Sequence, residues 1–193
     1  MVLTAYQFGI FPWYDEDSRV LWWFTHPRFV LFPEELHVSK SMRNVLNQNL
    51  FTVTYNRSFT EVMEACGSIN RPGQSGTWIH ESMKQVYGQL HDIGVAQSVE
   101  VYQSDQLVGG LYGIRLGNMF FGESMFARVS NASKVGFIFL VRRLRADGVV
   151  LIDCQQETRH LGSLGARLID REDFYEFIRR NWREIFKKDK DHS

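Results

Sequence analysis

The chain has 193 residues, of which 44% are hydrophobic and 14% aromatic, a composition typical of a globular protein of one or two domains. Lys plus Arg and Asp plus Glu both number 22, so any nucleic acid must be bound by a local basic patch rather than by net charge. Two cysteines are too few for a disulfide scaffold, and no apolar run approaches the roughly 20 residues of a membrane helix. We therefore expect a cytoplasmic protein with no membrane partner.

Residues 1–36 are dense in aromatic side chains and look extended. Three segments carry this pattern: Gly9–Trp13, Val20–Phe24 and Arg28–Phe32. They predict a small aromatic-rich sheet region at the N-terminus, followed by a second domain over residues 37–193.

The second domain alternates between helical and strand-like patterns. Ser39 is placed to cap a helix that ends near Asn47, and Ser58-Phe-Thr-Glu61 matches a capping box that opens another. Glycine-rich Gly67–Gly76 is the clearest loop and a candidate flap. Further helices are expected at 81–93, 131–146, 157–164 and 173–186, and strands at 51–55, 96–103, 107–115, 118–123, 149–153 and 166–169. This order predicts an α+β fold, an acyltransferase (GNAT)-like mixed sheet flanked by helices.

Two of these strands end in acidic residues. Glu123 closes one apolar run, and Asp153 with Gln155 closes another. Ligands of open α/β sheets bind at the carboxyl ends of strands, so we expect these side chains at one edge. The connection over residues 124–131 contains no glycine, which disfavours the pyrophosphate-binding turn of an acyl-CoA enzyme.

A set of motifs in fixed order makes the chain resemble the leucyl/phenylalanyl-tRNA-protein transferase family. They are Gly9–Trp13, Leu21–Trp23, Pro27–Arg28, Gly76–Ile79, Leu107–Gly113, Gly122–Phe126, Asn131–Lys134 and Leu151–Gln155. The resemblance implies transfer of Leu or Phe, with Met a third candidate, from aminoacyl-tRNA to the α-amine of proteins that begin with Arg or Lys. Such transfer marks proteins for the N-degron pathway and needs no cofactor.

The resemblance also implies catalytic roles for three residues. Asp153 and Gln155 match a pair in which the carboxylate polarises the amide, whose oxygen accepts the proton of the attacking amine. We weigh this equally against a pair that only orients the amine, with the proton passing to the tRNA or to water. Glu123 matches an acceptor-site residue, and two carboxylates would favour a cationic first residue.

Donor binding is expected from aromatic, apolar and basic residues. Trp22, Trp23 and Trp78 match positions near the 3′ end of the tRNA, where an indole can stack on adenine, although at least one of them is expected in the core. The slot for Leu or Phe is assigned to Leu111, Phe137, Leu140 and Ile152, and the tRNA phosphates to Arg142, Arg143 and Arg145.

Other chemistry has less support in the sequence. Cys154 with His160 suggests a thiol nucleophile, but strand alternation should turn Cys154 away from Asp153 and Gln155. No metal-ligand spacing is present. The alternatives that remain are a transferase acting on a cell-wall peptide and a non-catalytic tRNA-binding relative. Compared with the family, residues 1–36 look trimmed at their start.

Overall fold

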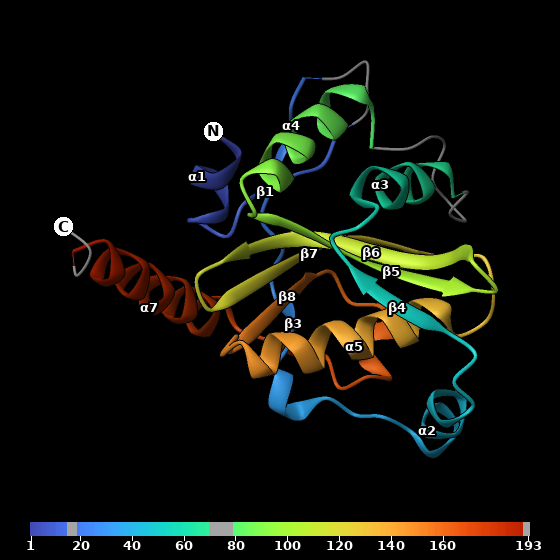
Figure 1. Ribbon diagram of the computed structural model, residues 1–193. Coiled ribbons are helices and arrows are strands. Elements are labelled where there is room, and N and C mark those ends of the chain that lie inside the picture. Colours follow the sequence, from blue (N-terminus) through green and yellow to red (C-terminus); the bar gives the residue numbers. More distant parts are fainter. Residues whose placement is uncertain (15–18, 70–78, 191–193) are drawn as a thin grey trace.

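The computed structural model describes residues 1–14, 19–69 and 79–190 and is built around a seven-stranded mixed sheet (Figure 1). From edge to edge its strands are β4 (Thr52–Tyr55), β5 (Ala96–Gln103), β6 (Gln106–Leu116), β7 (Met119–Ala127), β8 (Leu151–Gln155), β3 (Arg28–Leu31) and β9 (Arg167–Ile169). Neighbouring strands are antiparallel except β7 and β8, which are parallel. The α+β class and the mixed sheet flanked by helices are confirmed.

Helices cover both faces of the sheet (Figure 1). On one face lie α3 (Phe59–Ser68) and α4 (Glu81–Asp92), and on the other lies α5 (Ala132–Ala146). The remaining helices are α1 (Val2–Tyr6), η1 (Pro33–Glu35), α2 (Lys40–Asn47), α6 (Arg159–Gly162) and α7 (Arg171–Lys190). Each face carries its own hydrophobic core, because alternate side chains of a strand point to opposite faces.

The pairing of β7 with β8 ends before either strand does. It runs from Met119 opposite Leu151 to Phe121 opposite Asp153. Beyond this point β7 stays paired with β6 alone, and the end of β8 stays paired with β3. The two parallel strands therefore separate at their carboxyl ends, the position where open α/β sheets bind ligands.

The N-terminal region differs in two ways from the prediction. β1 (Phe11–Pro12) and β2 (Trp22–Trp23) do form a small antiparallel sheet. However, residues 2–6 form helix α1 instead of an extended segment, and this helix buries Tyr6 completely. The third segment joins the large sheet as β3, because its side chains are all buried and need partners on both faces.

Helix capping followed the sequence at one helix and not at another. The Ser39 hydroxyl accepts a hydrogen bond from the backbone N–H of Met42, as predicted. The capping box at Ser58 is wrong: its side chain makes no cap hydrogen bond, and its backbone N–H donates to Glu100. A long-range partner on β5 has replaced the local one.

Some expectations fall outside the described residues. Most of the candidate flap and Trp78 lie in residues 70–78, which the structure does not describe. Within the described ranges, no helix combines the length and apolar character needed to cross a membrane.

Candidate active site

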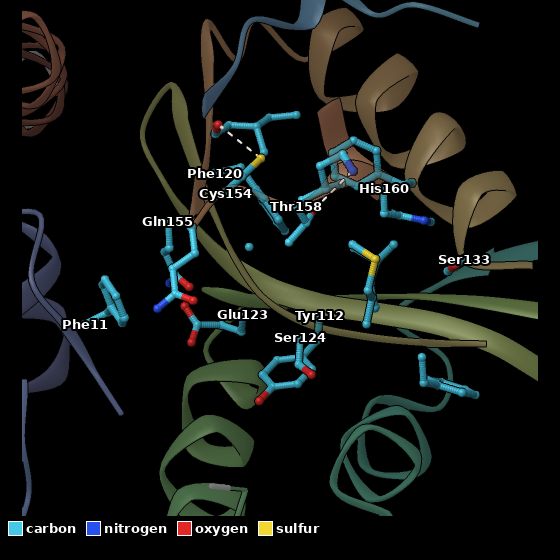
Figure 2. Close-up of a pocket in the computed structure, with 18 of the residues that line it drawn as sticks. Phe11, Tyr112, Phe120, Glu123, Ser124, Ser133, Cys154, Gln155, Thr158 and His160 are labelled. Atoms are coloured by element: carbon cyan, nitrogen blue, oxygen red, sulfur yellow. Dashed lines mark hydrogen bonds between the residues drawn. The ribbon is translucent and has the colours of Figure 1, made fainter. Parts of the chain in front are cut away.

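A cavity of about 500 Å³ lies where β7 and β8 separate (Figure 2). This size falls within the usual range for a small-molecule site. Its apolar lining comes from β6, β7, β8, α5 and the N-terminal segment and includes Phe11, Trp13, Leu111, Phe120, Met125, Phe137 and Ile152. Its polar lining includes Glu123, Ser124, Ser133, Gln155, Thr158 and His160. The cavity thus combines an apolar wall with a cluster of groups able to exchange hydrogen bonds or protons.

Asp153 is fully buried beside the cavity and is paired with Arg28. The guanidinium of Arg28 donates from Nε to Oδ1 over 2.8 Å and from Nη2 to Oδ2 over 2.6 Å, and neither side chain is exposed. Three rings, Phe11, Phe24 and Phe174, lie 4.6–5.3 Å from the guanidinium carbon. The charge of Asp153 is therefore neutralised within the core.

Gln155 adopts an uncommon backbone conformation at the end of β8. Its φ angle is +63°, in the left-handed region, which few residues other than glycine adopt. Its backbone N–H donates to Asp153 Oδ1 over 2.9 Å, and its carbonyl accepts from the Thr25 hydroxyl over 2.8 Å. Asp153 thus contacts the backbone of Gln155, and the buried side-chain Nε2 has no hydrogen-bond partner.

Glu123 lines the cavity and is half-buried (Figure 2). Tyr6 of α1 donates to its Oε1 over 2.5 Å, and Tyr87 of α4 donates to Oε2 over 2.9 Å. Burial raises the pKa of Glu123 to about 7, the two tyrosine hydrogen bonds oppose that rise, and Asp153 adds to it. This carboxyl group therefore exchanges a proton near neutral pH.

Cys154 and His160 also line the cavity, but they are poorly suited to nucleophilic catalysis. Cys154 packs with the α5 side of the sheet, opposite Asp153, as alternation predicted. Gln155 departs from that alternation through its positive φ, so it lines the same cavity as Cys154. Burial raises the pKa of the Cys154 thiol well above its usual range, which leaves it protonated. Burial lowers the pKa of His160, so its ring is neutral.

The four apolar residues predicted for the amino-acid slot fall into two groups. Leu111, Phe137 and Ile152 line the cavity. Leu140 is 3% exposed and lies in the core between α5 and the sheet, away from the cavity lining. It is one helical turn past Phe137, and the helix carries it beyond the opening.

Of the predicted tryptophans, Trp22 and Trp23 lie at the rim rather than in the cavity, and Trp78 lies outside the described residues. Trp23 is 44% exposed, its Nε1 donates to the carbonyl of Trp13, and the two rings are 5.9 Å apart. Trp22 is its neighbour on β2. Among the described tryptophans, it is Trp13 that lines the cavity, a residue for which no binding role was predicted.

Arg142, Arg143 and Arg145 lie on the exposed side of the last turns of α5. At 1.5 Å per residue they are about 14–18 Å along the helix from Ser133 at the cavity. Arg143 lies over the ring of Tyr55 at 4.4 Å. This basic group is separate from the cavity, on the same helix.

Several residues of the site escaped the sequence analysis. Arg28, Tyr6 and Tyr87 lie far along the chain from their partners, by 125, 117 and 36 positions. Arg28 was visible only within the Pro27–Arg28 motif and the Arg28–Phe32 segment, and Tyr87 only within the helix expected at 81–93. No local pattern pointed to Met125 as a lining residue.

No cluster of three His, Cys, Asp or Glu side chains suited to a metal ion occurs in residues 1–14, 19–69 and 79–190. The polar groups that line the cavity include a carboxyl group, an amide and hydroxyls, and they lie beside an apolar wall. Such a site suits acyl transfer to an amine, because an activated ester needs positioning and a proton acceptor.

Comparison with known proteins identifies the family. The sequence model described as leucyl/phenylalanyl-tRNA protein transferase matches residues 30–179, and that of the family's N-terminal domain matches residues 1–26. A leucyl/phenylalanyl-tRNA--protein transferase of Pseudomonas paraeruginosa is 56% identical over 93% of this chain and 79% of its own length. One from Christiangramia forsetii is 56% identical over 92% and 84%.

Among solved structures, a conserved protein of unknown function from Bacteroides thetaiotaomicron aligns with a TM-score of 0.49 and 14% identity. That alignment covers 73% of this chain and 54% of the other.

The protein is therefore an aminoacyltransferase. More specifically, the chain belongs to the leucyl/phenylalanyl-tRNA-protein transferase family, as its motifs indicated. This membership decides against the cell-wall transferase and against the non-catalytic tRNA-binding relative.

Proposed function

We propose that this protein transfers Leu or Phe from aminoacyl-tRNA to the α-amine of proteins that begin with Arg or Lys, and that the transfer takes place in the cavity between β7 and β8. The observation that carries the proposal is the composition of this cavity. It has room for one amino-acid side chain against apolar residues, and a titratable carboxyl group lies in the same cavity. Transfer in this way feeds the N-degron pathway.

The apolar wall favours Leu and Phe as donors. Leu111, Phe137 and Ile152 offer aliphatic and aromatic surface, and burying such a side chain is worth about 1.5–3 kcal/mol. Met is unbranched and fits the same wall as a third donor. Because a pocket of this kind discriminates by only about 1–3 kcal/mol per methylene, selectivity among the three should be loose.

The aromatic rim and the α5 arginines suit the tRNA. Trp22, Trp23 and Trp78 are assigned to the terminal adenosine, and the exposed Trp23 ring next to Trp13 supports this. Stacking of a base on an aromatic ring is worth about 1–3 kcal/mol. Arg142, Arg143 and Arg145, which are exposed on α5, are assigned to backbone phosphates of the tRNA.

The acceptor site is assigned to Glu123, with Asp153 and Gln155 as its neighbours on β8. The pairing of Asp153 with Arg28 supports a role for Asp153 in holding the backbone of Gln155, through the hydrogen bond to its N–H. Attraction of a cationic first residue then falls to Glu123, the one carboxylate among the described cavity-lining residues.

Two further proposals concern the setting of the reaction. The mixed sheet with its parallel β7–β8 pair, and helices on both faces, supports a GNAT-like fold in which residues 1–36 form a small N-terminal region and residues 37–193 the catalytic domain. The substrates, aminoacyl-tRNA and nascent or cleaved proteins, support action in the cytoplasm.

The test is a transfer assay with radiolabelled Leu-tRNA or Phe-tRNA and peptides that begin with Arg, Lys, Asp or Gly. We expect the Arg and Lys peptides to become one residue longer without ATP, metal or CoA. Transfer from leucyl-CoA but not from the tRNA, or equal transfer to all four peptides, would contradict the proposal.

A further inference from the structure

We propose that Glu123, held by the hydroxyls of Tyr6 and Tyr87, is the catalytic base: it takes the proton from the attacking α-amine and returns it to the departing 3′ oxygen of the tRNA. This inference rests on the proposed function and assigns the proton transfer that it leaves open. It differs from both mechanisms considered for Asp153 and Gln155.

Neither residue of the β8 pair is placed to take the proton. Both oxygens of Asp153 accept charge-assisted hydrogen bonds from Arg28, one also accepts from Gln155 N–H, and the side chain has no exposed surface. The amide oxygen of Gln155 is a very weak base, because an amide protonated on oxygen is a strong acid and loses its proton at once to water. Among the residues that the structure describes, Glu123 is the carboxylate that lines the cavity.

Three contacts join the side chains of Glu123, Tyr6 and Tyr87 in a closed ring. The Tyr6 hydroxyl lies 2.5 Å from Oε1, the Tyr87 hydroxyl lies 2.9 Å from Oε2, and the two hydroxyls are 2.8 Å apart. When Glu123 is ionised, the two tyrosine hydroxyls have only two hydrogens to donate across the three contacts, so one contact has no hydrogen bond. A proton on the carboxyl group fills the third contact: Glu123 donates to Tyr87, Tyr87 to Tyr6, and Tyr6 to Glu123. The cluster therefore binds an extra proton without leaving a buried polar group unpaired.

The charged and titratable groups around Glu123 favour easy gain and loss of this proton. Tyr6 faces it from α1, Tyr87 from α4, Asp153 from β8 and Arg28 from β3. Tyr112 of β6 packs against the ring of Tyr87. Burial and Asp153 favour the neutral form of Glu123, whereas the tyrosine hydrogen bonds and Arg28 favour the anion. A base whose pKa lies near the working pH is the most effective one.

The step balances with the substrates alone. The neutral α-amine attacks the ester carbonyl carbon, and as the C–N bond forms the nitrogen becomes positive. Glu123 takes one proton from this nitrogen. The C–O bond to the ribose then breaks, and Glu123 gives the proton to the 3′ oxygen. The products are an amide and a tRNA with a free 3′ hydroxyl, and Glu123 returns to its ionised form.

Tyr6 and Tyr87 are positioning residues in this account. Their hydrogen bonds stabilise the ionised carboxylate, so removal of either hydroxyl raises the pKa of Glu123. Tyr6→Phe and Tyr87→Phe should therefore shift the acidic limb of the rate profile to higher pH. Loss of packing alone would lower activity without moving that limb.

The experiment measures single-turnover transfer of Leu from Leu-tRNA to an Arg-initiated peptide between pH 5.5 and 9, at several peptide concentrations. Glu123→Gln preserves size and is compared with Glu64→Gln, a variant of an exposed glutamate on α3. We expect Glu123→Gln to lower the rate constant at saturating peptide by about 10²–10⁴-fold and to remove the acidic limb near pH 7. Glu64→Gln should change neither.

Three outcomes overturn the proposal. If Glu123→Gln raises only the KM for the peptide, Glu123 binds the acceptor and is not the base; if the acidic limb persists, another group titrates. A wild-type protein that transfers nothing from Leu-tRNA would instead overturn the proposed function itself. As a second readout, Glu123→Ala should regain activity in formate, which supplies a small carboxylate to the vacated position, and a folded variant without such rescue contradicts the proposal.

Discussion

The buried Arg28–Asp153 pair should be essential for stability, and breaking it tests the description of the site. Replacing Arg28 with Met removes two charge-assisted hydrogen bonds of 2.8 and 2.6 Å and leaves the Asp153 carboxylate buried without a cation. Breaking a fully buried pair from one side costs about 3–5 kcal/mol. Because the free energy of unfolding of a domain is only about 5–15 kcal/mol, Arg28→Met should reduce it by a large fraction.

The chain offers a closely matched control. Arg167 pairs with Glu35 in the same two-pronged geometry, at 2.8 and 3.1 Å, and also lies over an aromatic ring. It differs in exposure, since the two side chains are 51% and 44% exposed. Surface pairs contribute about 0–1 kcal/mol, so Arg167→Met should cost under about 1 kcal/mol beyond its lost packing.

Urea unfolding followed by tryptophan fluorescence measures both changes. The double variant Arg28→Met/Asp153→Leu should be more stable than Arg28→Met alone, because it removes the unpaired charge. It still leaves the Gln155 N–H without an acceptor, at about 1–3 kcal/mol. If Arg28→Met costs no more than Arg167→Met, or if the two changes at the buried pair simply add, the reasoning about buried charge is wrong.

Three further predictions follow from single features. Gly113→Ala should destabilise the protein by about 1–3 kcal/mol in urea unfolding, since a Cβ there would lie 2.3 Å from the Phe121 carbonyl oxygen. As a control, a Cβ at Gly88 on α4 would meet nothing within 4 Å, so Gly88→Ala should stabilise the protein by about 0.5–1 kcal/mol. Because the pKa of Glu123 is raised in the folded protein, its protonation contributes stability that is fully present below about pH 4.5 and is lost as pH rises through about 7. Glutamine does not titrate, so the free energy of unfolding of Glu123→Gln relative to wild type should increase between pH 5 and 8. A difference that stays constant with pH would refute this linkage. Replacing the three exposed α5 arginines with glutamine should reduce the salt slope of tRNA binding by about 2–3, with an unchanged slope counting against phosphate contact.

Local patterns predicted most of the fold because the elements depend on local chemistry. The three-stranded meander from residue 96, the helix after Asn131 and the Ser39 cap all follow from alternation, periodicity and turn residues. The register of distant strands does not follow from such patterns. β3 was placed in the N-terminal sheet because its sequence resembles its neighbours, but its burial comes from strands β8 and β9, more than 100 residues away.

The carboxylates were found because they end strands, but their roles depend on partners that sequence spacing does not reveal. Two acids at one sheet edge suggested a doubly negative acceptor site. Arg28, from a strand 125 residues earlier, neutralises one of them. Likewise, the interaction between Tyr6, Tyr87 and Glu123 requires an N-terminal helix that the aromatic-rich pattern did not predict.

The site therefore separates two functions of a carboxylate between two residues. Asp153 carries a charge that is always compensated, so its geometry is constant and it can hold the backbone of Gln155 in a left-handed conformation. Glu123 carries a charge that changes near neutral pH, in a cluster whose third hydrogen bond is completed when the carboxyl group takes up a proton. A proton acceptor of this kind needs a rigid neighbour, because the amine must approach it at one distance while the proton moves. The Arg28–Asp153 pair supplies that rigidity, and it does so without competing for the proton.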